Sequence, residues 1–571
     1  MRIQICKWNC GRANSLAGIL ALTVASQLLA APLAHSGEVK ATYGQGWLEQ
    51  IDNLPVLHMK GSEREMGEQY GYLMGDMITR QVDNLRDIAM NQEPKITKWI
   101  PKPIFNGLRR IVGALFWTSF SSDVKDHIEG IVEGASLRPD HIKLHKMDIA
   151  FINTLIDLVG IVNAIGEKVQ SMGGNHVTVR DILTVLGAPD IKANCDSFAA
   201  WGPRTVGGKT FQTRNTDIDT GYGIEKYPLV IFYQRDGKIP VVSASFVGMV
   251  GIFAGMNAHG LALGQVWAFS KDVKLTNPWH LQVREIFMES RTAREAVFRF
   301  GRMKNTTYGS NFVIADAGDG NDGRFSEGFS IETSAKNFEV FEANDPRELE
   351  LKFNGESVGL PIQYATARGD LTLSPTLRAR STSAAGPEGD PRTTGSYQSR
   401  YKGQIDRILA YEKAGVLIGH EQAETISRET AMRGSSLQAS VYANTDRDMW
   451  VSYAETQADG TSRQAYDGVY HYIPFHQYLS RLDYNADSKQ LAVSSWMPES
   501  RRNFDVIVSR PERKVSRGWF RKPQIIPATQ SKFALLADRE EKSFGDAGAL
   551  QAGDVVELRE GAQLIDRTVV R

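Results

Sequence analysis

Cysteine is scarce in this chain of 571 residues, which contains only three. The first two lie in residues 1–36, a segment with a basic start, a short apolar run and small residues before Gly37. This pattern is typical of a signal peptide. Its removal would leave Cys195 as the last cysteine, without a partner for an internal disulfide. A lone thiol in an exported protein is a candidate reactive group, although free cysteine is also a common small buried hydrophobe.

An excess of charge of one sign is also missing. Lys and Arg together number 66, as do Asp and Glu, so the formal net charge is zero. Proteins that bind nucleic acid usually carry a basic excess, so we expect no nucleic-acid partner. No stretch beyond the N-terminal segment approaches the run of about 18 apolar residues that a membrane helix needs. We therefore expect a periplasmic or secreted protein without a stable membrane span.

Several catalytic motifs are absent. The sequence has no G-x-S-x-G nucleophile motif and no Walker phosphate-binding loop. His420-Glu421 lacks the second histidine of a zinc-binding H-E-x-x-H, and the acidic segment 316–323 breaks the spacing of a calcium loop. We expect that the protein needs neither a metal nor an organic cofactor.

Helices are predicted in the first part of the chain and mainly strands in the second. Apolar residues at helical spacing predict helices over 61–90, 100–120 and 123–165, and residues 166–194 predict a linker. Segment 100–120 is amphipathic; a core helix is favoured, and contact with lipid is the alternative. Short β-favouring runs follow at 198–201, 210–213, 229–233, 241–246, 261–266, 311–315, 328–332 and 440–453, with helices over 279–300 and 404–414. Such blocks indicate an α+β fold.

The residues around Cys195 suggest a nucleophile that is activated by cleavage of the chain. If the bond between Asn194 and Cys195 is cut, the new α-amino group has a pKa of about 7.7–8.0 and can act as the base for the thiol. Before the cut this nitrogen is an amide and cannot act as a base. The thiol itself can attack the Asn194 carbonyl, and water can then release the resulting thioester.

In this setting the sequence resembles the acyl-coenzyme A:6-aminopenicillanic acid acyltransferase family of Ntn (N-terminal nucleophile) hydrolases. More distantly, it is similar to choloylglycine hydrolases, penicillin V acylases and acid ceramidase. The resemblance is carried by several segments in the same order between about residues 57 and 455. These segments are 61–71, 129–135, Cys195, Arg214-Asn215-x-Asp217, 255–261, 311–316 and Ser399-Arg400-Tyr401.

The resemblance implies roles for the residues that match the family motifs. Cys195 would be the nucleophile, and Asp217 would accept a hydrogen bond from its amine. Arg214 would lower the pKa of the thiol, as nearby cations do. Asn257 would stabilise the oxyanion of the tetrahedral intermediate. The plain alternatives are an ion pair between Arg214 and Asp217, and a turn at Asn257.

Two weaker candidates complete the site, and two positions depart from the family pattern. Asn311 resembles a second asparagine on a later strand, and Arg400 belongs to the Ser-Arg motif. Asn194 replaces a frequent glycine and Asp196 a frequent threonine. A carboxylate at Asp196 would oppose formation of the neighbouring thiolate unless Arg214 offsets it.

The resemblance also implies an αββα four-layer sandwich preceded by a mainly helical pro-region. We divide the chain into a signal peptide (1–36), the pro-region (37–194), a catalytic domain (195–510) and a C-terminal extension (511–571) of unassigned role. After self-cleavage the two pieces are expected to stay associated.

We therefore expect an exported, self-processing amidohydrolase or acyltransferase. It would cleave or transfer the acyl group of a linear amide through a thioester on Cys195, with a small acyl amide or lipid-like molecule as substrate. Two alternatives remain open. One is a phospholipase B-like lipid acyl hydrolase, favoured by the apolar segment 100–120; the other is a catalytically inactive exported binding protein.

Overall fold

The computed structural model describes most of residues 37–570. The ranges outside the description are 1–36, 92–101, 172–192, 221–222, 304–305, 319–324, 382–389, 486–489, 497–501, 516–523, 527–528, 538–541, 545–549 and 571. The predicted signal peptide therefore lies outside the described residues, and so does most of the predicted linker.

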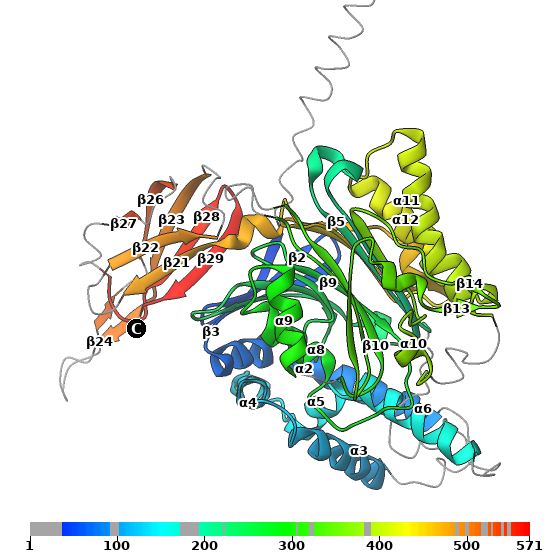
Figure 1. Cartoon of the computed structure of the whole chain (residues 1–571). Helices are drawn as coiled ribbons and strands as arrows, with labels where there is room; N and C mark the ends of the chain where they lie inside the picture. The colour runs from blue at the N-terminus through cyan, green and yellow to red at the C-terminus, as the bar shows by residue number, and fades with distance from the viewer. Residues whose placement is uncertain are drawn as a thin grey trace, which may run out of the picture.

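Two large sheets form the main body of the molecule (Figure 1). Within the described residues, ten strands join in the order β1-β2-β3-β6-β7-β8-β9-β10-β11-β12. Neighbours in this sheet are antiparallel, except that β3 pairs parallel with β6. Its strands are β1 Glu38–Tyr43, β2 Gly46–Ile51, β3 Leu54–Gly61, β6 Pro228–Arg235, β7 Val241–Phe246, β8 Ala254–Asn257, β9 Ala262–Trp267, β10 Ser310–Ala315, β11 Gly328–Thr333 and β12 Phe338–Glu342.

The second sheet carries Cys195 and packs face to face on the first. Its order is β15-β4-β5-β16-β17-β20. The strands are β4 Ala193–Ala200, β5 Phe211–Ile218, β15 Ala365–Arg368, β16 Gln438–Ala443, β17 Asp448–Tyr453 and β20 His471–Ile473. A Cβ on Gly264 of β9 would lie 2.0 Å from the Ser197 hydroxyl oxygen of β4, so a residue without a side chain is required where the two sheets meet.

Helices cover the outer sides of both sheets, which confirms the α+β class. Helix α2 (Glu63–Asn91) packs on β2 and β3 of the first sheet. On the second sheet, α12 (His420–Thr430) packs on β5 and β16, beside α11 (Lys402–Ala414) (Figure 1). Two helices, α8 (Trp279–Phe287) and α9 (Ala293–Met303), replace the single helix predicted over 279–300.

The helices predicted before Cys195 are confirmed. They are α2, α3 (Lys102–Trp117), α4 (Ser122–Leu137), α5 (Lys146–Ile152) and α6 (Leu155–Ser171). A Cβ on Gly71 of α2 would lie 2.0 Å from the Ile131 carbonyl oxygen of α4, so this pair packs backbone to backbone. None of the described helices is long and apolar enough to cross a membrane alone; α5 and the start of α6 pass that test only as a pair bent by 61°.

The first 194 residues differ from the prediction in two details. The segment is mainly helical, as predicted, but it begins with β1, β2 and β3, and β3 pairs directly with β6 of the later part. Alternate burial of Trp47, Glu49 and Ile51 against the core holds β2 in this sheet. In addition, α6 continues to Ser171, so the first residues of the predicted linker are helical.

The C-terminal strands form a lobe with its own small core, drawn in orange and red in Figure 1. The lobe starts at β21 (Ser480–Asn485), before the predicted boundary at residue 511. Its other strands are β22 Gln490–Ser495, β23 Arg502–Arg510, β24 Arg513–Val515, β25 Gln524–Ile526, β26 Thr529–Ala537, β27 Lys542–Phe544, β28 Val555–Glu560 and β29 Gln563–Val569. Its core includes Leu482, Phe504 and Leu558.

A cluster of buried polar residues, called the joint below, connects this lobe to β2 and β3. The Lys60 ammonium lies 2.5 Å from Asp566 Oδ2 and donates to the Leu482 carbonyl at 2.7 Å. The Tyr478 hydroxyl and the Gln563 amide both donate to the Glu49 carboxylate. The joint therefore consists of Glu49, Lys60, Tyr478, Gln563 and Asp566.

Candidate active site

Cys195 lies near the start of β4, and 1% of its surface is exposed. It stands opposite Thr216 of β5, and Asp196 stands opposite Asn215. Because successive side chains of a strand point to opposite faces, Cys195 shares its face with Thr216 and Arg214. Asp196 and Asp217 belong to the other face, which α11 and α12 cover. The two faces therefore divide the predicted site residues into two sets.

Arg214 lies on the face of the thiol and is completely buried. Its Nε donates to the Gln265 carbonyl of β9 at 3.1 Å, and its guanidinium also bonds to the Thr216 hydroxyl. The guanidinium carbon lies 4.8 Å from the centre of the Phe253 ring. These contacts hold the positive charge of Arg214 beside Cys195. Among the described bonds, no carboxylate bonds directly to this guanidinium.

The thiol of Cys195 is neutral in the uncut chain. Burial raises its pKa to about 12, although the charge of Arg214 and a hydrogen bond from the Asp217 backbone act in the opposite direction. Burial also lowers the pKa of Arg214. A thiol with this pKa carries almost no thiolate at neutral pH, and the thiolate is the nucleophilic form.

Asp196 turns away from the sulfur. Its carboxylate accepts hydrogen bonds from Asn215 at 3.1 Å and from Gln404 at 2.5 Å, and a third bond comes from Thr430. Burial raises its pKa to about 6. Because the side chain points to α11 and α12, its charge lies on the opposite face of β4 from the thiol.

Asp217 and Arg400, two of the predicted site residues, lie close together on the face that α11 and α12 cover. Asp217 Oδ2 accepts the Met432 backbone N–H at 2.8 Å and lies 3.9 Å from Arg400 Nε. Burial, and then the charge of Asp196, raise the pKa of Asp217 well above its usual range. The predicted hydrogen bond from the Cys195 amine to Asp217 would require cleavage of the chain before Cys195, and it stays a prediction.

In the uncut chain the Cys195 backbone N–H donates to Asp370, which was not among the sequence candidates. The distance from Cys195 N to Asp370 Oδ1 is 2.9 Å, and Arg400 bonds to Asp370 Oδ2. Asp370 follows the end of β15, the strand beside β4. The pairing of β15 with β4 brings it to Cys195, and the short run Ala365–Arg368 gives no clear strand signal in the sequence.

The two predicted asparagines lie in different surroundings. The Asn257 amide donates to the carbonyls of Phe287 and Ser290, and its oxygen accepts the N–H groups of His259 and Leu261. Both of its hydrogens are therefore used by carbonyls at and just after the end of α8, and its oxygen holds the local turn, which corresponds to the plain alternative for this residue.

Asn311 lies nearer to the nucleophile through the loop that carries Asp370. Its amide donates to the carbonyls of Gly369 and Leu371, both at 3.0 Å. The structure thus brings together four of the predicted residues: Cys195, Arg214, Asp217 and Arg400. Asn311 contacts this group through the loop that carries Asp370. Among the described bonds, Asn257 has no contact with the group.

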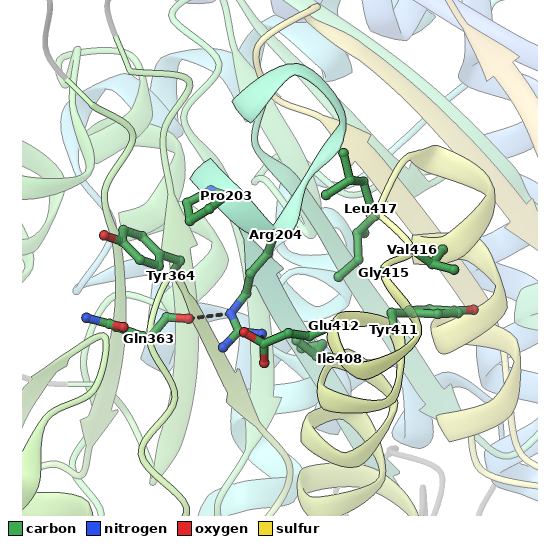
Figure 2. Close-up of a pocket in the computed structure, with 11 residues that line it drawn as sticks. Pro203, Arg204, Gln363, Tyr364, Ile408, Tyr411, Glu412, Gly415, Val416 and Leu417 are labelled. Atoms are coloured by element: carbon green, nitrogen blue, oxygen red, sulfur yellow. Dashed lines mark hydrogen bonds and ion pairs between the residues drawn. The ribbon is translucent and has the colours of Figure 1, made fainter.

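A cavity of about 300 Å³ lies away from Cys195, beyond the other end of β4 (Figure 2). Arg204 lies between the Gln363 carbonyl, at 2.5 Å, and the Glu412 carboxylate, at 2.9 Å. The walls of this cavity also include Tyr364, Tyr411 and Val416. At about 3.3 Å per residue, the strand separates this cavity from Cys195 by well over 15 Å. Among the described residues, no group of three or more His, Cys, Asp or Glu could hold a metal ion.

Comparisons with known proteins give only distant structural similarity. No family model and no curated protein matches the sequence. The chain is similar to the solved structure of the Caenorhabditis elegans ortholog of N-acylethanolamine-hydrolyzing acid amidase, at 14% identity over 44% of this chain and 93% of that chain, with a TM-score of 0.31.

Two further solved structures show a similar level of likeness. One is a mutant of the conjugated bile acid hydrolase from Clostridium perfringens, at 13% identity over 48% of this chain and 94% of that chain, with a TM-score of 0.29. The other is penicillin V acylase from Agrobacterium tumefaciens, at 13% identity over 45% and 83%, with a TM-score of 0.29. Scores this low do not establish a shared fold, so the proposals below depend on the motifs and on the contacts around Cys195.

Proposed function

We propose that the protein is an exported, self-processing Ntn hydrolase or acyltransferase with the αββα sandwich of that class. It acts on the acyl group of a linear amide through a thioester on Cys195. One observation carries this proposal: Arg214 lies beside the thiol, while the backbone nitrogen of the same residue donates to Asp370, whose second carboxylate oxygen bonds to Arg400. A buried carboxylate at a backbone nitrogen becomes useful chemically when that nitrogen is a free amine.

The first step of the proposed mechanism activates the enzyme. The sulfur of Cys195 bonds to the carbonyl carbon of Asn194, the bond from this carbon to the Cys195 nitrogen breaks, and the thiol proton moves to that nitrogen. Water then hydrolyses the thioester, which releases the Asn194 carboxylate and restores the thiol. The cut removes the neighbouring peptide unit, so the thiol becomes accessible to substrate.

The mature enzyme then repeats this chemistry on a substrate amide. The α-amine takes the thiol proton, the sulfur attacks the acyl carbonyl, and the departing amine receives the proton. Arg214 stabilises the developing thiolate. Water or an acceptor amine takes the acyl group from the thioester. The uncut chain is inactive toward substrate amides in this mechanism, because the thiol is buried and the Cys195 nitrogen is still an amide that cannot act as its base.

Intact-mass analysis of the purified wild type beside Cys195→Ala tests the proposal. The wild type should separate into two masses with Cys195 at a new N-terminus, and it should hydrolyse N-acyl amides. The variant should stay whole and inactive while it melts at a similar temperature. A wild type that is folded, remains whole and acts on no acyl amide would contradict the proposal.

The surface of α3 favours a lipid acyl hydrolase as the second candidate. Ile104, Ile111 and Leu115 form a stripe along this helix and are 57%, 58% and 56% exposed. An apolar stripe on an amphipathic helix suits a substrate that is presented at a lipid surface. Incubation with phosphatidylcholine vesicles separates the candidates: release of fatty acid, with no hydrolysis of N-acyl amides, selects the lipid acyl hydrolase.

A further inference from the structure

We propose that Asp370 is a carboxylate partner of the Cys195 amine in the mature enzyme, and that Asn311 and Glu332 are positioning residues that hold it there. The inference rests on the proposed function, because the free amine exists only after cleavage. It adds to the predicted role of Asp217, since an ammonium group has three hydrogens and can bond to more than one acceptor.

The contact already exists in the uncut chain. The Cys195 nitrogen lies 2.9 Å from Asp370 Oδ1, and the guanidinium of Arg400 bonds to the other carboxylate oxygen. Asp370 is buried, with 8% of its surface exposed. A positive partner on one oxygen leaves the other to accept the hydrogen of the nitrogen. Cleavage changes the charge of that nitrogen but not its position at the start of β4, so the same pair becomes charge-assisted.

Asn311 fixes the backbone on both sides of Asp370. Its side-chain amide donates to the Gly369 carbonyl and to the Leu371 carbonyl, at 3.0 Å each. Two hydrogens on one nitrogen allow this bridge, which a carboxylate at the same position could not make. The loop around Asp370 is therefore held from the neighbouring β10 of the first sheet.

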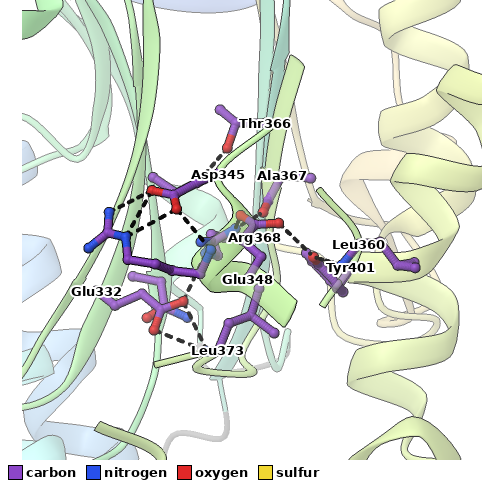
Figure 3. Close-up of polar contacts among 12 residues, drawn as sticks. Glu332, Asp345, Glu348, Leu360, Thr366, Ala367, Arg368, Leu373 and Tyr401 are labelled. Atoms are coloured by element: carbon purple, nitrogen blue, oxygen red, sulfur yellow. Dashed lines mark hydrogen bonds and ion pairs between the residues drawn. The ribbon is translucent and has the colours of Figure 1, made fainter. Parts of the chain in front are cut away.

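Glu332 of β11 holds the same loop at two further points (Figure 3). Its Oε1 accepts from Arg368 Nε at 2.9 Å, just before Asp370. Its carboxylate also accepts the backbone N–H groups of Leu373 and Ser374, just after Asp370. Glu332 and Arg368 are both completely buried. Buried polar groups that are joined by several hydrogen bonds hold one another in place.

The support extends to Arg400, the second partner of Asp370. Arg368 also donates to Glu348 at 2.8 Å, and Glu348 accepts from the Tyr401 hydroxyl at 3.3 Å (Figure 3). Tyr401 follows Arg400 directly in the chain. One buried network thus fixes both the loop of Asp370 and the backbone beside Arg400.

The chemical consequence concerns the base of the reaction. A carboxylate beside an amine favours the ammonium form and raises the pKa of the amine. The amine acts as base only when it is free, so kcat/KM should rise with pH through this pKa. Loss of the Asp370 charge lowers the pKa and moves the acidic limb of the profile to lower pH. Loss of the hydrogen bond also releases the orientation of the amine, which lowers kcat.

The experiment compares the full-length wild type with Asp370→Asn, Asp370→Glu, Asn311→Ala and the matched control Asp196→Asn. Each protein is left to cleave itself, its masses are recorded, and kcat and KM for N-acyl-7-amino-4-methylcoumarins are measured against pH. For Asp370→Asn we expect kcat about tenfold lower and an acidic limb about one unit lower in pH. In Asp370→Glu and in Asp196→Asn, the acidic limb of the kcat/KM profile should lie at the same pH as in the wild type.

Asn311→Ala keeps the inference testable if Asp370→Asn fails to fold or to cleave. This variant retains every charge and loosens only the loop that carries Asp370. The acidic limb of its kcat/KM profile should therefore move to lower pH by a smaller amount, with KM unchanged. Limbs identical to that of the wild type in every Asp370 and Asn311 variant that cleaves would overturn the role of Asp370 while leaving the proposed function intact. A wild type that neither cleaves nor hydrolyses amides would overturn both.

Discussion

The buried polar residues of the joint and those around Cys195 differ in which parts of the chain they connect and in whether a reactive group lies among them. In the joint, Lys60 lies 2.5 Å from Asp566, and neutral donors from Tyr478 and Gln563 bond to Glu49. Around Cys195, three carboxylates (Asp196, Asp217 and Asp370) are accompanied by two guanidinium groups (Arg214 and Arg400).

The comparison shows what each buried cluster contributes. The groups of the joint bond across the C-terminal lobe and strands β2 and β3 and hold these two parts of the chain together. Around the nucleophile, burial raises the pKa of the Cys195 thiol to about 12 and that of Asp196 to about 6. Ionisable groups with shifted pKa values are typical of functional sites, because their protonation can change during the reaction. Substitutions in the two clusters should therefore affect different measurements.

Arg214→Met should have the largest effect on chemistry. The variant removes the cation that opposes the high pKa of the thiol, so self-cleavage should slow by about 100-fold or more. The rate at which the new N-terminus appears, followed by intact mass, measures this change. Arg284→Met is the matched control, because Arg284 is another buried arginine that pairs with Glu63 away from Cys195. It should lower the melting temperature and retain the cleavage rate; equal losses of rate in both variants would contradict the comparison.

Lys60→Met should have the opposite pattern. Removal of one partner leaves Asp566 buried without its cation, which typically costs about 3–5 kcal/mol of stability. Chemical denaturation measures this loss, and cleavage below the melting transition should proceed at the wild-type rate. The double variant Lys60→Met/Asp566→Leu should regain most of the stability. If it does not, the joint contributes through more than this ion pair.

Asp196→Asn should have a small effect on chemistry, although Asp196 is adjacent to Cys195 in the chain. Its carboxylate bonds to Asn215, Gln404 and Thr430 on the other face of β4. We expect the cleavage rate to stay within about threefold of the wild type, since the hydrogen bonds that it loses do not include the reacting atoms. A loss comparable to that of Arg214→Met would show that the two faces of the strand act together.

Asp157→Asn should have the smallest effect and should change stability in a pH-dependent way. Asp157 of α6 is completely buried, and burial raises its pKa to about 7. The folded chain therefore holds this proton more tightly than the unfolded chain. The contribution of Asp157 to stability is present below about pH 4 and is lost as the pH rises through about 7. The variant should melt a few degrees higher than the wild type at pH 8, and the gain should shrink at pH 5. A gain that is equal at both pH values would contradict the shift.

Much of the local structure could be predicted from the sequence. The helices before Cys195 and the strands β5, β6, β7, β9, β10 and β11 follow from apolar periodicity and from turn residues. The hairpin between β6 and β7 turns at Asp236-Gly237, where Gly237 has φ of 68°, as its sequence predicts. Strands β1 to β3 are not among the predicted elements, although the apolar residues of β2 and β3 carry a signal of the same kind.

The grouping of the site residues could be predicted only in part. Arg214 and Asp217 lie on the strand beside Cys195, and Arg400 reaches the group from the segment before α11. Asp370 is separated from Cys195 by 175 positions, and the pairing of β15 with β4 brings them together. The surroundings of Asn257 also depended on the tertiary structure, because its amide is used by backbone carbonyls from α8 and the turn that follows it.

The sequence by itself determined which chemical groups this protein possesses: one cysteine beyond residue 36, the carboxylates and arginines that follow it, and the periodicity that makes strands and helices of the segments between them. Only the tertiary structure decided on which face of β4 each group lies and which carboxylate meets the Cys195 nitrogen. The physical reason is that strand alternation is local, whereas strand pairing and burial depend on segments that are far apart in the chain, and burial sets the protonation of the thiol.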